Sequence, residues 1–114
     1  MNLTKLCDEL RIFAQERDWE QFHTPKNLAS ALIVEASELL EHFQWLKTGE
    51  LAELDERKQN EIRHELADVL MYLVRLADKL DVDLMAAASE KLEHNRIKYP
   101  TEKVRGDSRK YSEY

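Results

Sequence analysis

Four acidic residues give the clearest chemical signal in this sequence, because they form two pairs with the same spacing. Glu35 and Glu38 make the first pair, and Glu65 and Asp68 make the second. Residues three positions apart lie on one face of a helix, so both carboxylates of a pair can reach one ion. Carboxylate oxygens are the hard ligands that Mg²⁺ accepts, and Mn²⁺ is an acceptable substitute. Two such pairs on facing helices predict a magnesium site.

Both pairs interrupt apolar stripes. At about 100° per residue, Glu35 lies on the same face as Leu32 and Leu39, and Asp68 is the only charged residue in the stretch 66–74. Burying an unpaired carboxylate is costly, and neighbouring like charges raise the cost. A lone Glu-x-x-Glu is usually a solvated helix face. Two pairs in apolar stripes instead favour a bound cation as the compensating charge.

Helices must position these acids, because the chain has only two Gly and two Pro. That shortage excludes sandwiches and barrels, which need many tight turns. The spacing of apolar residues predicts helices over about residues 3–17, 27–46, 59–80 and 84–98. The expected fold class is all-α, a four-helix bundle-type protomer. One domain would cover residues 1–100, followed by a polar tail without helix over 101–114.

Composition excludes several classes of function. The chain has 17 Lys plus Arg and 23 Asp plus Glu, a formal charge of −6, so the basic surface of a nucleic-acid-binding protein is absent. Two glycines cannot build a glycine-rich phosphate loop, and Cys7 has no second cysteine to pair with. No apolar run approaches the ~20 residues of a membrane span, and no secretory signal is visible. We expect a cytoplasmic protein without nucleic-acid or membrane partners.

The third expected helix indicates a partner subunit. Apolar side chains in the stretch 66–74 point around the whole helix, which is typical of a helix buried on all sides. Left exposed, Leu70, Met71 and Val74 would form a large apolar patch. We therefore expect an obligate oligomer with helices packed across the subunit interface. The alternative is that the first and fourth helices cover both faces within one chain.

Several motifs resemble one protein family. Besides the ExxE and ExxD acid pairs, they are RDWEQFH at 17–23, FQW at 43–45, DVLMY at 68–72 and NRIKYP at 95–100. In this combination the chain resembles the MazG-like all-α nucleoside triphosphate pyrophosphohydrolases, and among them the dCTP pyrophosphatase branch. The resemblance covers nearly the whole chain. This sequence differs from some members at Leu10, where they have His, and at Val34 and Ser37, where Gly often flanks the acids. These differences concern base preference and leave the four acids intact.

The resemblance implies a reaction and a set of site residues. Members cleave a nucleoside triphosphate between the α and β phosphorus atoms, and here the implied substrate is dCTP or a related or modified deoxynucleotide. All four acids match metal-binding positions. The implied substrate-binding residues are Trp19, Glu20, Gln21, Phe22, His23, Trp45, Tyr72, Lys91, Asn95, Lys98 and Tyr99. The family also implies self-association, as a homodimer or as a dimer of dimers (a homotetramer).

The chemistry of a triphosphate is consistent with these residues. An acidic protein repels an anionic substrate, so a divalent ion must bridge the acids and the phosphate oxygens. Glu38 is displaced from the centre of its stripe toward a cleft, and it is our candidate for accepting the proton of the attacking water, with Glu35 as the second catalytic acid. Lys91 and Lys98 would neutralise the departing pyrophosphate.

Other interpretations remain open at this point. A di-iron carboxylate bundle needs two Glu-x-x-His pairs, and only Glu61 with His64 qualifies on a core helix. A non-catalytic helical interaction module could use its acids for a structural cation or a basic partner. Individual residues also have structural interpretations: Trp45 and Tyr72 as core residues, His23 as a turn residue, and the lysines of the last helix as solvated.

Overall fold

All regular elements of the described chain, residues 1–109 and 112 of the computed structural model, are helical. The long helices are α1 (Leu3–Glu16), α2 (Pro25–Glu41), α3 (Glu56–Lys79) and α4 (Leu84–Lys98). Short 3₁₀ helices, η1 (Glu20–Phe22) and η2 (Leu51–Glu53), precede α2 and α3, and α5 (Thr101–Val104) follows α4. The expected all-α class is confirmed. Among the described residues, no helix combines the length and apolar character needed to cross a membrane.

Side-chain caps explain where the long helices begin. The residue before each helix accepts a hydrogen bond from the backbone N–H three positions later, at 2.7–3.2 Å, and these residues are Asn2, Thr24, Asp55 and Asp83. Such caps satisfy N–H groups that have no partner inside the helix. Pro25 takes the first position of α2, where its missing N–H costs nothing. As a result α2 and α3 begin two and three residues earlier than the apolar spacing predicted.

The predicted end of α2 at Leu46 is wrong, because the helix ends at Glu41. The backbone N–H groups of His42 and Phe43 bond to carbonyls only three residues back, at 3.2 and 2.9 Å. This tighter turn leads into a loop that Glu53 holds together by accepting hydrogen bonds from the backbone N–H groups of Lys47, Thr48 and Gly49 at 2.8, 2.8 and 3.0 Å.

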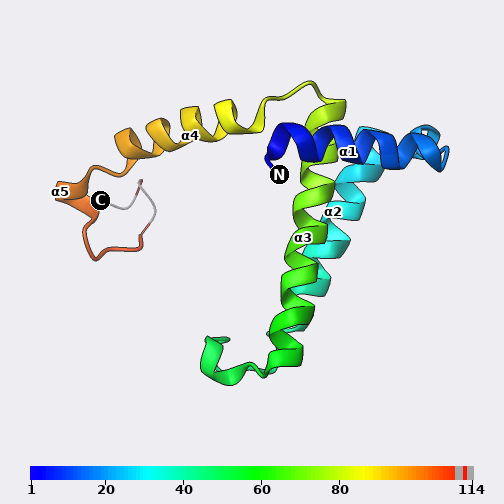
Figure 1. Cartoon of the computed structure of the whole chain (residues 1–114). Helices are drawn as coiled ribbons and strands as arrows, with labels where there is room; N and C mark the ends of the chain where they lie inside the picture. Colours follow the sequence, from blue (N-terminus) through cyan, green and yellow to red (C-terminus); the bar gives the residue numbers. More distant parts are fainter. Residues whose placement is uncertain (110–111, 113–114) are drawn as a thin grey trace. The chain divides into compact units, whose positions relative to one another are not determined.

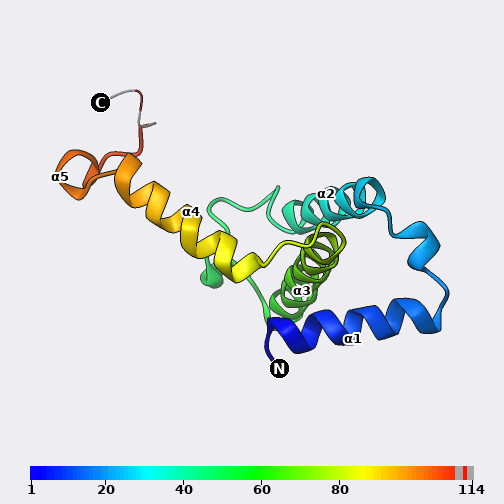
Figure 2. The ribbon, with the colours of Figure 1, turned by 90° about the horizontal axis from the view of Figure 1, so that it is seen from above.

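The first compact unit, residues 1–81, is organised around α3. Helix α3 lies between α1 and α2 (Figure 2), and α1 crosses one end of it (Figure 1). The buried apolar residues are few and mostly small: Ala14, Leu28, Ile62, Val74 and Ala77. This core fixes α2 and α3 side by side, which places the two acid pairs on neighbouring helices.

A second compact unit begins at Val82 and contains α4 and α5. Helix α4 has the expected bounds, whereas the expectation of a tail without helix is wrong at α5, where the backbone N–H of Lys103 bonds back to Pro100 at 2.9 Å. Residues 110, 111, 113 and 114 of the predicted tail lie outside the described residues. The four-helix bundle arrangement and the domain boundary at residue 100 stay predictions.

Large apolar side chains stay exposed on α2 and α3. On α2, Ile33 is 67% exposed and Leu40 is 64% exposed. On α3, Leu66 and Leu70 are 53% and 41% exposed. Helices α1 and α2 therefore do not enclose α3 on all sides.

Candidate functional site

Three of the four predicted metal-binding acids come together between α2 and α3. One carboxylate oxygen from each of Glu35, Glu38 and Glu65 lies within 4.8 Å of the other two. Glu35 and Glu65 are half-buried, and Glu38 is exposed. The three-residue spacing puts Glu35 and Glu38 on one face of α2, and the packing of α3 against that helix brings Glu65 to them. We call these three residues the acid cluster.

The acid cluster carries more negative charge than its surroundings balance. The pKa of Glu35 is raised from 4.5 to about 8, chiefly because its carboxyl shares a hydrogen bond with Glu65, then because of burial and of the nearby Glu38. In the described part of the chain, Oε1 of Glu65 is buried and lacks a hydrogen-bond partner as long as both carboxylates are ionised. Two ionised carboxylates have no donor to share, so either a proton on Glu35 or a cation must fill this position.

The donor set suits a hard divalent cation. All ligand atoms on offer are carboxylate oxygens, which Mg²⁺ and Mn²⁺ accept. A cation at the acid cluster would partner Oε1 of Glu65 and remove the repulsion among the three acids. These residues therefore fit the predicted metal.

Asp68 does not join the acid cluster. It follows Glu65 by three residues, a rise of about 4.5 Å along the helix, and it lines a neighbouring cavity of about 300 Å³. The structure thus brings together three members of the predicted quartet and puts the fourth in the wall of this cavity. The other residues that line the cavity are Leu10, Phe13, Trp19, His23, Met71, Tyr72 and Arg75.

Three predicted substrate-binding residues, Trp19, His23 and Tyr72, meet in the cavity wall. Trp19 packs edge-to-face on Phe13, with ring centroids 5.7 Å apart. The guanidinium carbon of Arg17 lies 3.6 Å from the centroid of the Phe13 ring. These contacts hold the indole ring against the cavity. A mainly apolar cavity with a few polar groups is typical of a small-molecule site.

The remaining residues of the RDWEQFH segment point elsewhere. Glu20 pairs with Arg75 and Lys79 of α3. The side-chain amide of Gln21 donates to the backbone carbonyl of Asp18 at 3.0 Å. Phe22 is 59% exposed.

Trp45 is 88% exposed in the loop after α2, so the alternative that it is a core residue of this chain is wrong. The other predicted residues, Lys91, Asn95, Lys98 and Tyr99, lie on α4 or directly after it, within the second unit. Their contact with substrate stays a prediction.

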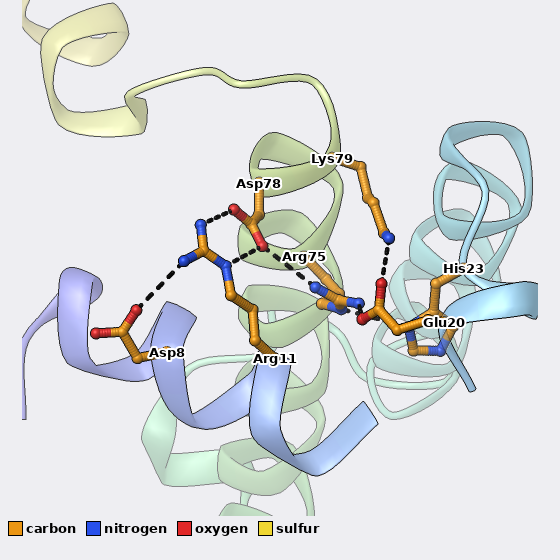
Figure 3. A network of polar contacts seen from close by, with 7 residues as sticks. All are labelled: Asp8, Arg11, Glu20, His23, Arg75, Asp78 and Lys79. Atoms are coloured by element: carbon orange, nitrogen blue, oxygen red, sulfur yellow. Dashed lines mark hydrogen bonds and ion pairs between the residues drawn. The ribbon is translucent and has the colours of Figure 1, made fainter. Parts of the chain in front are cut away.

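A polar network around Arg75 is the main feature that sequence reasoning missed (Figure 3). Arg75 is only 4% exposed, and it contacts Glu20, His23 and Asp78. Asp78 also accepts a hydrogen bond from Nε of Arg11 at 2.8 Å, which ties α1 to α3. The sequence did contain an indication that Arg75 lies near the site. Arg75 follows Asp68 by seven residues and so lies on the same face of the helix.

Comparisons with known proteins identify the family of the chain. A sequence model described as the MazG-like family matches residues 31–114, which include all four acids. The chain is 48% identical over 103 residues to dCTP pyrophosphatase 1 of Homo sapiens and 45% identical to that of Rattus norvegicus. Each alignment covers 89% of this chain and 61% of the relative, so the chain spans about three fifths of the length of these proteins.

A solved structure supports the fold. The crystal structure of a pyrophosphatase from Archaeoglobus fulgidus superposes with a TM-score of 0.79 at 44% sequence identity, covering 85% of this chain and 91% of that one. The family match and this structural similarity extend over most of the chain. The protein belongs to the MazG-like family.

Proposed function

We propose that this protein is a magnesium-dependent nucleoside triphosphate pyrophosphohydrolase that acts on dCTP or a related or modified deoxynucleotide. The relatives named dCTP pyrophosphatase 1 and the archaeal pyrophosphatase support the reaction class. The observation that carries the proposal is the acid cluster with the unpartnered, buried Oε1 of Glu65, next along α3 to the cavity wall at Asp68. Water would add across the α–β phosphoanhydride, giving monophosphate and pyrophosphate.

Glu35, Glu38 and Glu65 would hold the metal, with Asp68 as a further ligand from the cavity side. When bound, the ion supplies positive charge between these acids and the phosphate oxygens and lowers the pKa of water. Glu38 is the exposed member of the acid cluster, so it can accept the proton of the attacking water while Glu35 stays in the interior.

The cavity would bind the nucleoside. Trp19 and Tyr72 offer aromatic faces for stacking, worth about 1–3 kcal/mol per base. Trp45 is exposed and free to cover a bound base from the loop after α2. Lys91 and Lys98 of α4 would meet the phosphates, together with Asn95 of the same helix and Tyr99 directly after it.

The protein would act as a homodimer or a dimer of dimers. The support is the exposed apolar surface of α2 and α3, which includes Ile33, Leu40, Leu66 and Leu70. A surface of this kind on a small protein is typical of an interface. Light scattering of the purified protein tests this, and a monomeric mass would refute it. The cytoplasmic location and the absence of nucleic-acid or membrane partners stay predictions.

Product analysis tests the reaction directly. Purified protein is incubated with dCTP, dATP, dTTP and dGTP in turn, with Mg²⁺ or with a chelator, and the products are separated by chromatography. We expect dCMP and pyrophosphate in the presence of Mg²⁺ only. Nucleoside diphosphate with orthophosphate would reject the proposed bond, and no turnover of any nucleotide by the folded protein would favour the non-catalytic interaction module.

A further inference from the structure

The guanidinium of Arg75 is a buried cation that borders the cavity. A buried charge is stable only when its donors have partners. Nε donates to Nδ1 of His23 at 3.3 Å, Nη1 donates to Asp78 at 3.2 Å, and Nη2 pairs with Glu20 (Figure 3). All three nitrogens are therefore engaged, and one of them is engaged with a residue of the cavity wall.

The contact with His23 determines which of its ring nitrogens carries the hydrogen. The Nε–H of arginine can only donate, so Nδ1 of the imidazole must accept and cannot itself be protonated. A second ring proton would bring two N–H groups and two cations face to face. Burial, then the charge of Arg75, and to a lesser extent that of Lys79, lower the pKa of His23 against the opposing effect of Glu20. Both the contact and the lowered pKa favour a neutral ring with its hydrogen on Nε2.

That leaves Nε2–H as the polar group of His23 that a ligand can meet. His23 lines the cavity, and Nε2 has no hydrogen-bond partner in the portion of the chain that the structure describes. The imidazole lies 6.2 Å from the Trp19 ring, centroid to centroid. A fixed N–H donor beside an aromatic wall favours ligands that present an acceptor and disfavours those that present a donor.

We propose that Arg75 is a positioning residue, which holds His23 as a neutral Nε2–H donor to an oxygen acceptor of the bound nucleoside. The acceptor is a base carbonyl or a sugar hydroxyl oxygen. The identity of the ligand rests on the proposed function, whereas the hydrogen placement on His23 is a property of the free protein.

NMR of the imidazole nitrogens tests the hydrogen placement without any nucleotide. In the wild-type protein at neutral pH, we expect a bare Nδ1 and a protonated Nε2, with the His23 signals assigned by their loss in His23→Gln. Arg75→Met cannot donate, so both neutral forms of the ring become populated and the signals shift. A hydrogen on Nδ1 in the wild type overturns the proposal even if the variant does not fold.

Steady-state kinetics with dCTP test the positioning role. Arg75→Met is expected to raise KM by about 2- to 10-fold, the loss of one neutral hydrogen bond, with kcat nearly unchanged. The matched control is Arg11→Met, which breaks the same network at Asp78 and does not contact His23; its KM should equal that of the wild type. Equal increases in both variants would show that the network is only structural and would overturn the proposal.

Two substrate analogues identify the acceptor. If the KM difference between wild type and Arg75→Met vanishes with 2-thio-dCTP, the acceptor is the base carbonyl. If it vanishes with the dideoxy nucleotide, the acceptor is the sugar hydroxyl. A difference retained with both analogues excludes both of these oxygens and overturns the proposed acceptor. If the wild type turns over no nucleotide, the proposed function fails, and the NMR measurement still decides the role of Arg75.

Discussion

Glu35→Gln should have opposite effects on the stability of the metal-free protein and on its activity. A pKa of about 8 in the folded state against 4.5 in the unfolded chain means that folding favours the protonated form of Glu35. The unfolded state binds fewer protons between these two values, so the metal-free wild type loses stability as pH rises from 4.5 to 8. Gln mimics the neutral carboxyl and should remove this loss.

The difference between the two pKa values of Glu35 limits the stability gained by Glu35→Gln to about 5 kcal/mol. Solvent screening reduces it, because Glu35 is only half-buried and Glu38 is exposed. We expect Glu35→Gln to stabilise the metal-free protein by about 1–2 kcal/mol near pH 8, which corresponds to a rise in Tm of about 3–10 °C for a chain of this size. Below pH 5 the two proteins should have the same Tm.

Thermal unfolding followed by circular dichroism in a chelator, between pH 5 and pH 8, measures this difference. Adding Mg²⁺ should raise the Tm of the wild type and not that of Glu35→Gln. The Glu35→Gln variant should also lose turnover. The control is Glu41→Gln, since Glu41 is an exposed acid at the end of the same helix and lies outside the acid cluster. A lower Tm for Glu35→Gln at pH 8 in chelator, or an unchanged pH dependence, would refute the reasoning.

Three further variants test separate parts of the molecule. Asp68→Asn should lower kcat by about 100-fold or more without changing helicity, because it removes one charge from the cavity wall beside the acid cluster; activity within a fewfold of the wild type would exclude this residue as a ligand. Trp45→Ala should raise KM for dCTP by about 5- to 100-fold through lost stacking, and its Tm should not change because the side chain is 88% exposed; an unchanged KM would remove it from the site. Glu53→Gln should lower the Tm at neutral pH, because hydrogen bonds from Thr48 and the neighbouring backbone lower the pKa of Glu53 from 4.5 to about 2. That stabilisation is present above pH 4.5 and is lost as pH falls through 2, so the Tm gap from wild type should narrow in acid; a gap independent of pH would contradict the assigned pKa.

Local chemistry explains which helix bounds could be predicted. The bounds of α4 match the spacing and its Asp83 cap. Helix α2 begins earlier and ends earlier than predicted, because Pro25 and Thr24 form a start signal and the tight turn at His42 interrupts an apolar pattern that continues to Leu46. Apolar periodicity reports burial, and it cannot distinguish a helix from a turn that buries the same residues.

The sequence by itself determined the acid pairs and their helices. The three-residue spacing of Glu35 and Glu38 is a one-dimensional fact that any helix converts into a shared face. The resemblance of the flanking motifs indicated the family, which the comparisons confirmed.

Only the tertiary structure decided how these residues meet across helices. The packing of α3 against α2 brings Glu65 into the acid cluster and leaves Asp68 on the cavity. The tertiary structure also buries Arg75 against His23, which lies 52 positions earlier in the chain. Spacing along one helix fixes angles within that helix. Distances between helices depend on how their side chains interlock, and on which donors and acceptors are left to pair once water is excluded.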